Sequence, residues 1–411
     1  MRRFKVATLL NVLGLSVAFV AFMCIAMQLR YDHEFDTCYP KSECIFRVDA
    51  VHDDGGSQSV INRPLSRMFG ESSPHILKYG ISSIGIGSSY FYVTHNADKI
   101  TYKEPRRYVS PELPEVLGFE MLEGKIDALK EPNAVLIPQS MAKRIFGNRS
   151  AVGKLFQFDN PELSPMIVRG VFKDLPRNAT FSNTIYQAIK EKENYDEWKN
   201  WSYHVYVRLD DAANKQVVIE NFHANYDQLK AGYKQANDDV NLRLTPMPEL
   251  HYLPNVSFDT TPKASRQTLY VLSAIAIIIL LIAGINFTNF STALTPMRIK
   301  SINTQKVLGS SDGILRFSLL VEAVIISLTS FGVAVFILRL LADTSFTSLM
   351  EPDISIASQL PVVGITAVIS IVLGGIAGLY PTFYITSFPP ALALKGSFGL
   401  SPKGRKMRSV L

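Results

Sequence analysis

Cysteine is scarce in this chain, with 3 residues among 411. So few cysteines exclude the disulfide framework that stabilises many small secreted domains. Cys38 and Cys44 are near enough in sequence to form one bridge, although two separate thiols suit so short a spacing better. Cys24 lies in an apolar run, where a thiol behaves as a small hydrophobic side chain.

Motifs for nucleotide hydrolysis and for nucleophilic or metal catalysis are also missing. Residues 118–125 and 147–154 have the wrong glycine spacing for a P-loop, and neither closing lysine is followed by Ser or Thr. There is no Gly-x-Ser-x-Gly sequence. None of the 7 histidines lies three or four residues from another histidine or a cysteine. We therefore expect no catalytic residue, no metal and no cofactor, and we predict that the chain is neither an ATPase nor another enzyme.

Long apolar runs are present, and four of them are long enough to cross a bilayer as helices. The first is preceded by basic residues, as in a signal peptide, but it is longer than the apolar part of such a peptide and has no small-residue cleavage site before Arg30. The third contains Arg316, Glu322 and Arg339, which can reach a polar interface. We predict transmembrane helices at residues 6–29, 269–294, 314–341 and 361–383.

The basic residues next to these runs predict the orientation, because cytoplasmic loops are enriched in Lys and Arg. Residues 340–394, which include the connection between the third and fourth runs, contain no Lys or Arg. We therefore expect both termini in the cytoplasm, residues 30–268 outside it, and a multi-pass protein of the bacterial inner membrane. The basic residues that set this bias are Arg2, Arg3, Lys5, Arg298, Lys300, Lys306, Lys395, Lys403, Arg405, Lys406 and Arg408.

The formal net charge of +6 does not indicate a nucleic-acid partner. The basic excess is concentrated beside the apolar runs, whereas residues 30–268 have a net charge of about −2. The charge therefore reflects membrane topology, and we expect lipid rather than nucleic acid around the basic segments.

Residues 30–268 have the pattern of an α+β domain. Helices are predicted at residues 138–146, which Gly147 ends, and at 211–231, where Val217, Val218, Phe222 and Tyr226 form one apolar stripe. Runs rich in β-branched and aromatic residues predict strands at residues 44–51, 89–94, 166–172, 201–209 and 240–244.

Several segments together resemble the FtsX/MacB-type ABC transporter permeases, especially the large ones of the Bacteroidetes. The membrane half contains INFTNFSTAL (285–294), KVLGSS (306–311), LLVEAVIISL (319–328) and GLYPTFYITSFPPALALKGSF (378–398). The remaining matches are LLNVLGLSVA (9–18), YDHEFD (31–36), CIFRV (44–48), VLGFEMLEG (116–124), NAVLIPQSMAKRIFG (133–147), VGKLF (152–156) and VRGVFKDLPRNATF (168–181).

The resemblance implies a permease subunit that transmits ATP-driven motion from a separate cytoplasmic ATPase to a MacB-like periplasmic core domain. Such a subunit would export or extract a peptide, drug or lipoprotein, as a homodimer or heterodimer and with a periplasmic or outer-membrane partner. An alternative is an FtsX-like regulatory scaffold that controls an envelope protein such as a cell-wall hydrolase. The chain is also similar to the first half of eight-span relatives, so an inactive half-permease is a third interpretation.

In this family a cytoplasmic loop between the second and third helices contacts the ATPase. The resemblance places this loop at residues 295–313, between membrane helices that belong to the segment 269–411. Relatives commonly have an acid, a glycine and an arginine before the KVLG stretch, whereas this chain has Ser301, Asn303 and Gln305. The residues expected to form the coupling site are Arg298, Lys300, Lys306, Val307, Leu308 and Gly309.

Three polar residues are expected inside the membrane segments. Glu322 is either a functional acid or the local ion-pair partner of a base such as Arg316. Asn286 and Asn289 are three residues apart, and we interpret them as packing residues that hydrogen-bond between helices. The run that contains them is longer than a bilayer core requires, which suits either a stiff connecting helix or ordinary tilt.

Overall fold

The computed structural model describes residues 2–52, 55–95, 98–160, 162–233 and 241–389. The chain forms two compact units. One unit is Glu34–Ser265, and the helices on either side of it in the sequence form the other. The expected basic tail at Lys395–Arg408 and the expected first strand residue, Val240, lie outside the described residues.

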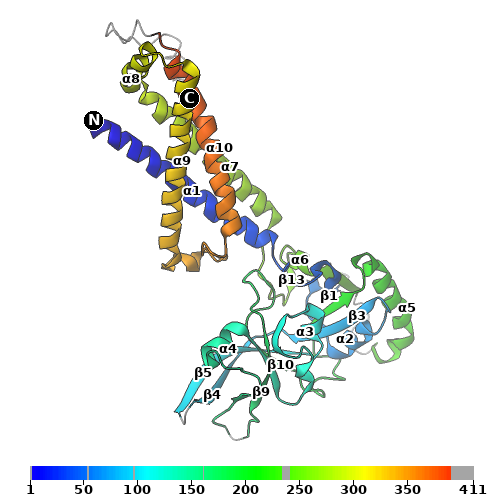
Figure 1. Cartoon of the computed structure of the whole chain (residues 1–411). Coiled ribbons are helices and arrows are strands. Elements are labelled where there is room, and N and C mark those ends of the chain that lie inside the picture. The colour runs from blue at the N-terminus through cyan, green and yellow to red at the C-terminus, as the bar shows by residue number, and fades with distance from the viewer. Residues whose placement is uncertain (1, 53–54, 96–97, 161, 234–240, 390–411) are drawn as a thin grey trace. The chain divides into compact units, whose positions relative to one another are not determined.

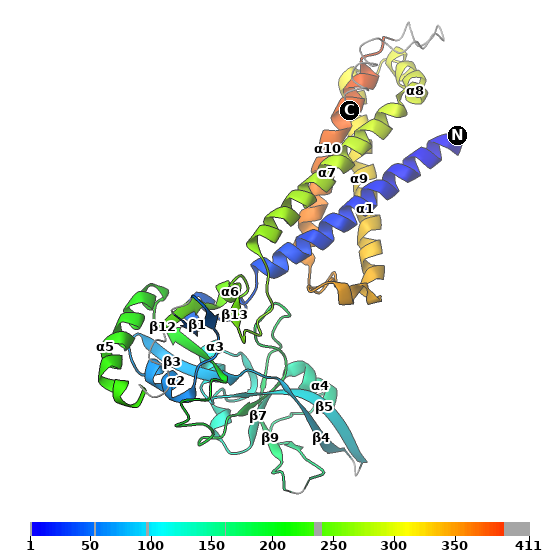
Figure 2. The ribbon, with the colours of Figure 1, turned by 180° about the vertical axis from the view of Figure 1, so that it is seen from behind.

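The helical unit contains four helices that are long and apolar enough to span a membrane, within the described residues. Figures 1 and 2 show α9 beside α10 and α1 beside α7. A shorter helix, α8, and a 3₁₀ helix, η4 (Ser345–Leu349), lie between the long ones in sequence. The bounds are α1 Arg2–His33, α7 Arg266–Ala293, α8 Thr295–Val307, α9 Asp312–Ala342 and α10 Leu360–Thr386.

Small side chains allow α9 and α10 to approach closely. A Cβ atom added at Gly378 would lie 2.6 Å from the Cβ of Ala323, so a larger residue there forces the helices apart. Two hydroxyl groups add bonds between helices: Ser327 Oγ donates to Ser370 O at 2.7 Å, and Ser16 Oγ donates to Ser330 O at 2.9 Å. Close packing and hydroxyl bonds thus replace the hydrophobic effect, which lipid does not supply between helices.

The described part of Glu34–Ser265 forms one 13-stranded, mostly antiparallel sheet with helices packed on it. This confirms the predicted α+β domain between membrane helices. The helices are α2 Arg63–Gly70, α3 Leu113–Leu117, α4 Gln139–Phe146, α5 Lys215–Tyr233 and α6 Met247–Leu250, with 3₁₀ helices η1 Ser42–Cys44, η2 Ala128–Lys130 and η3 Ala212–Asn214. The strands are β1 Ile45–Val51, β2 Ser57–Gln58, β3 Ile76–Ser83, β4 Gly87–His95, β5 Asp98–Val109, β6 Met121–Gly124, β7 Ala134–Pro138, β8 Leu155–Phe156, β9 Met166–Phe172, β10 Ile185–Ala188, β11 Tyr203–Leu209, β12 Asn241–Pro246 and β13 Val256–Ser257.

Strand β1 is central to one half of the sheet, because it pairs with β2, β11 and β12. Three strand pairs, β5 with β10, β7 with β9 and β2 with β13, are parallel. Helices α2 and α5 cover the β1 half, where the rings of Phe69 and Phe222 lie 5.2 Å apart. Helix α4 covers the other half and buries Met141 and Ile145.

The structure differs from the prediction in the buried stripe of α5 and in the first residue of α4. Val217 is 39% exposed, because the buried stripe of α5 repeats every four residues from Val218 through Phe222. Pro138 ends β7 and caps α4, and Gly147 closes that helix at a φ of 66°. All three cysteines are unpaired, so the Cys38–Cys44 bridge is absent.

Candidate coupling helix

The segment 295–313, expected to be a loop, is mainly the helix α8. Pro296 stands at its first turn, where a missing N–H costs nothing. One face buries Ile299 and Ile302, and Ile302 packs with Leu315 of α9 and Ile385 of α10. The apolar face is too short to be recognised as a membrane span, which is why the sequence indicated only a connection.

An ion pair joins α8 to α9. Arg298 donates from Nη1 and Nη2 to the two carboxylate oxygens of Glu322, at 2.9 and 2.6 Å. The suggested partner Arg316 is therefore wrong: its Nε donates to Thr386 Oγ1 at 3.0 Å, and its guanidinium lies 4.6 Å from the Phe383 ring. A two-bond Arg–carboxylate pair fixes orientation as well as distance.

A second set of contacts holds the far end of α8. Lys306 Nζ lies 2.7 Å from a carboxylate oxygen of Asp312, the first residue of α9, and also donates to the carbonyl of Thr386 on α10. The Lys306 side chain is only 12% exposed. We call these contacts, with the Arg298–Glu322 pair, the α8 anchor, because they tie both ends of the helix to α9 and α10.

The end of α8 leaves an exposed apolar tip. Val307 is 63% exposed and Leu308 is 81% exposed, although both are apolar. Gly309 follows with a φ of 98°, a left-handed conformation that reverses the chain toward α9. Lys300, on the outer face of α8, is also exposed. Exposed apolar residues beside a charge are typical of a surface that binds another protein.

The two asparagines do not form the expected bonds between helices. Within the described residues, Asn286 and Asn289 are exposed, whereas Thr288 between them donates to Ala377 O on α10 at 3.0 Å. Asn286 instead lines a groove of about 340 Å³ between α1 and α7, whose lining also includes Gly14 and Ala18. The spacing of the asparagines was visible in the sequence, but the face they occupy was not.

Two features of this site were not predicted from the sequence. Asn303 is 3% exposed, and within the described residues its amide has no hydrogen-bond partner. The partner of Glu322 lies 24 positions away on a segment that was not expected to be helical, so no local spacing indicated it.

The described residues contain no cluster of three or more His, Cys, Asp or Glu side chains placed to hold a metal ion.

Comparison with known families identifies both halves of the chain. Residues 8–224 match the MacB-like periplasmic core domain, and residues 273–390 match the FtsX-like permease C-terminal domain. The chain belongs to the FtsX/MacB family of permeases. It is therefore an inner-membrane permease subunit with a periplasmic segment, of a family that works with a cytoplasmic ABC ATPase.

Three solved structures are similar to the permease. A domain of a proposed permease protein from Porphyromonas gingivalis is 21% identical, with a TM-score of 0.42, and the match covers 51% of this chain and 91% of that one. The periplasmic region of MacB from Actinobacillus actinomycetemcomitans is 16% identical, with a TM-score of 0.32 and coverage of 50% and 89%. The extracellular domain of YknZ, a noncanonic ABC-type transporter from Gram-positive bacteria, is 12% identical, with a TM-score of 0.33 and coverage of 49% and 99%. A comparison with curated proteins gives no match.

Proposed function

We propose that this permease transmits motion from a separate cytoplasmic ATPase to its periplasmic domain, for export or extraction of a peptide, drug or lipoprotein. The observation that supports the proposal is the α8 helix, which exposes an apolar tip while both of its ends are tied to the membrane helices. A docking element needs both properties, because a loose segment would absorb the motion of its partner.

Motion applied to the tip has two paths along the bundle. The α8 anchor connects it to α9 and α10 through Glu322, Asp312 and Thr386. The chain itself connects it to α7, which ends at Ala293 just before α8 begins. At 1.5 Å per residue, the 28 residues of α7 span about 42 Å, more than a bilayer core of about 30 Å. Helix α7 continues directly from the periplasmic domain, so it supplies a stiff covalent connection.

The orientation in this proposal follows from the basic residues. Helix α8 carries Arg298, Lys300 and Lys306, which places it in the cytoplasm by the positive-inside rule. Both termini then lie on the same side, and residues 34–265 lie in the periplasm. The connection between α9 and α10 also lies on the periplasmic side, since it has no Lys or Arg.

We further propose that the permease works as a dimer that uses the groove between α1 and α7. The lining of the groove includes small residues, exposed apolar side chains and Asn286. A polar amide facing lipid is unfavourable, whereas an amide facing a second helix finds a partner. This gives Asn286 a packing role between subunits rather than within one.

A regulatory role at the periplasmic face is the second candidate, and the β4–β5 hairpin favours it. Tyr90 on its outer face is 59% exposed, and Lys103 lies 5.2 Å from the Tyr90 ring. Lys99 lies 4.4 Å from the ring of Tyr92 on the same face. Exposed tyrosines are enriched where proteins bind one another.

The experiment that tests the proposed function is purification of the tagged full chain from its native membranes, followed by an ATP-hydrolysis assay of the eluate. We expect activity with the natural chain and its loss with Leu308→Asp, because a carboxylate cannot bury in an apolar interface. Leu349→Asp is the control, since Leu349 is 79% exposed but lies on η4 at the other connection. Absence of ATPase from the natural chain, or equal loss in both variants, would contradict the proposal.

A further inference from the structure

The two segments that connect the periplasmic domain to its membrane helices have unusual backbone conformations. Residues 34–41 follow α1, and residues 255–265 precede α7. Among the described residues, six that are not glycine have a positive φ, and four of these lie in the two segments: Asp36 (59°), Lys41 (52°), Asn255 (57°) and Phe258 (60°). Asp and Asn tolerate this conformation, but for Lys41 and Phe258 it costs free energy, so surrounding contacts must hold these two residues in place.

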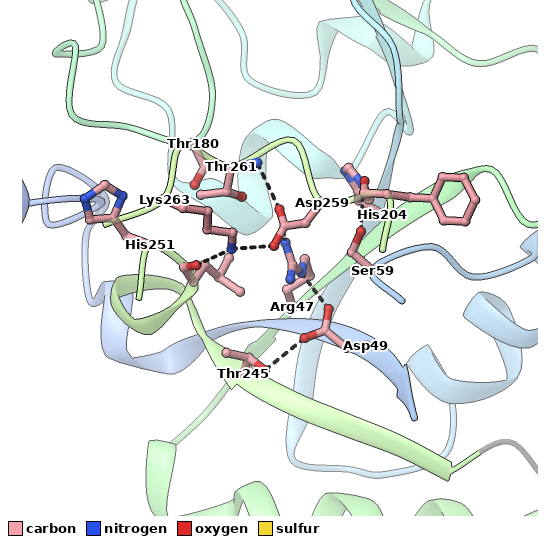
Figure 3. Close-up of polar contacts among 12 residues, drawn as sticks. Arg47, Asp49, Ser59, Thr180, His204, Thr245, His251, Asp259, Thr261 and Lys263 are labelled. Carbon is pink, nitrogen blue, oxygen red and sulfur yellow. Dashed lines mark hydrogen bonds and ion pairs between the residues drawn. The ribbon is translucent and has the colours of Figure 1, made fainter. Parts of the chain in front are cut away.

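Buried ion pairs hold the segment before α7. Arg47 on β1 lies 2.6 Å from a carboxylate oxygen of Asp49 and 2.8 Å from one of Asp259 (Figure 3). All three side chains are at most 2% exposed. Lys263 Nζ donates to the other oxygen of Asp259 and to the carbonyl of Leu250, each at 2.6 Å. The segment is thereby fixed to the central strand of its half of the sheet.

Arg47 and Asp259 stabilise each other's charged forms. Burial by itself would raise the pKa of the Asp259 carboxyl. Arg47 and Lys263 lower this pKa by a larger amount, so the net pKa is well below its ordinary value. Desolvation lowers the pKa of Arg47, but the carboxylates of Asp49 and Asp259 raise it overall. A buried charge that loses its partner is strongly destabilising. The pairs therefore resist separation.

A different set of contacts holds the segment after α1. The carboxylate of Asp36, which is fully buried, accepts bonds from Thr180 N and Thr180 Oγ1, both at 2.6 Å. The backbone N–H of Asp36 donates to Asn178 O at 2.8 Å. Tyr39 Oη accepts a bond from Phe181 N at 3.3 Å. Three of the four consecutive residues 178–181 thus form hydrogen bonds with the segment that follows α1.

His251 joins the two segments to each other. Its ring stacks on Phe35, with centroids 3.9 Å apart and planes within 5°. Its Nδ1 lies 2.6 Å from Pro262 O and donates to it, since a carbonyl only accepts. Its own carbonyl accepts from Ala264 N at 2.9 Å. One side chain therefore contacts both the segment that follows α1 and the segment that precedes α7.

We propose that Arg47, Asp259 and His251 clamp the two membrane connections to each other and to strand β1, so that the connections move as one body with the sheet. Displacement of α7 would then reach the whole domain rather than stretch its connecting segment. We call this set, with Asp49 and Lys263, the junction clamp. The inference concerns the domain itself and can be tested without an ATPase, so its failure would leave the proposed function untouched.

Hydrogen exchange of the full chain in detergent or nanodiscs, read by mass spectrometry, tests the clamp. In the natural chain, the amides of residues 36–39, 259–261, 263 and 264 should exchange as slowly as those of β1. In Asp259→Asn, we expect exchange at least tenfold faster in both segments, although the substitution lies in only one. Amides of β9 serve as the reference for a folded domain. Lys173→Met is the control, because it removes an exposed pair with Glu120.

Faster exchange confined to residues 255–265, or no change in either segment, would overturn the clamp. If Asp259→Asn also speeds the exchange of β9 amides, the domain has unfolded. The milder substitution Lys263→Met then tests the clamp instead. Lys263 contacts Oδ2 of Asp259 and Arg47 contacts Oδ1, so loss of Lys263 leaves Arg47 and Asp259 paired. A smaller but joint acceleration in both segments is then expected, and acceleration in one segment alone would again overturn the proposal.

Discussion

The two groups of ion pairs in this permease differ in how completely the protein covers their side chains. In the junction clamp, the side chains of Arg47, Asp49 and Asp259 are between 0 and 2% exposed. In the α8 anchor, the acidic partners are more exposed: Glu322 is 44% and Asp312 is 50% exposed, while Arg298 and Lys306 are 23% and 12% exposed. Buried pairs cannot separate without leaving an uncompensated charge, whereas pairs that the protein covers only in part can rearrange at a lower cost in free energy.

This difference matches the two roles proposed for the chain. A domain that receives motion must keep its connections fixed, and buried charges do this. A helix that docks a partner through an ATP cycle must be held and yet able to shift, and half-exposed pairs allow both. The predictions below test this comparison from the largest expected effect to the smallest.

Loss of one buried charge should destabilise the periplasmic domain most. We expect Asp259→Asn to lower its free energy of unfolding by about 3–5 kcal/mol, because Arg47 is left buried with half of its compensation. Both tryptophans, Trp198 and Trp201, lie in this domain, so their fluorescence during urea unfolding of the full chain reports on it alone. Glu120→Gln, which breaks an exposed pair, should cost less than about 1 kcal/mol. Equal effects would remove the distinction between the two classes of pair.

The pH dependence of the same unfolding should change with Asp36→Asn. Burial raises the pKa of Asp36 from 3.8 to about 7, so its contribution to stability is lost as pH rises from about 4 to 7. Burial lowers the pKa of His204 from 6.5 to about 4, so its contribution is lost as pH falls through that range. The two slopes oppose each other in the natural chain.

Removal of Asp36 should therefore expose the slope of His204. In Asp36→Asn, we expect stability to rise between pH 4 and 6.5, by at most about 1.4 kcal/mol per pH unit. His204→Gln should show the opposite slope. A natural chain with a steep slope in this range, unchanged by either substitution, would show that neither group is buried in the way described.

Removal of the Glu322 charge should weaken ATPase recruitment while leaving the fold intact. The pair with Arg298 is half-exposed, so Glu322→Gln should reduce recovery of the ATPase by about fivefold, equivalent to about 1 kcal/mol. Asp343→Asn is the control, because the Arg339–Asp343 pair at the other end of α9 is similar in kind and more exposed. Quantitative pull-down measures both. Unchanged recovery with Glu322→Gln would mean that α8 docks without this pair.

Charge reversal along α8 should separate docking from anchoring. Lys300→Glu changes an exposed side chain, so it should reduce ATPase recovery in a salt-dependent manner without altering protein yield. Lys306→Glu places a carboxylate beside Asp312 and the carbonyl of Thr386, so it should also lower the thermal stability of the membrane bundle. Thermal unfolding in detergent distinguishes the two. Identical behaviour would indicate that Lys306 is not an anchor.

Much of the fold could be predicted from the sequence because its signals are local. Apolar runs indicated the membrane helices, and β9 was predicted at the bounds it has, Met166–Phe172. Helix α8 was missed because its buried face is completed by Leu315 and Ile385, which are distant in sequence. Its amphipathic pattern was too short to be separated from a loop.

The residues of the coupling site were named by family resemblance, but their roles depend on tertiary contacts. Lys306 was expected to face a partner, and it is mostly buried against α9 and α10. The junction clamp was not predicted at all. Arg47 and Asp259 are more than 200 positions apart, and an arginine inside a strand is ordinarily exposed.

The central claim is that the tip of α8 contacts the ATPase, and site-specific photo-crosslinking tests it most directly. A photoreactive amino acid placed at Leu308 in the full chain, in native membranes, should give an adduct that contains a nucleotide-binding subunit. The same group at Leu349, which is 79% exposed, should give none. An ATPase adduct at Leu349 but not at Leu308 would contradict the account, because the partner would then bind at the opposite connection.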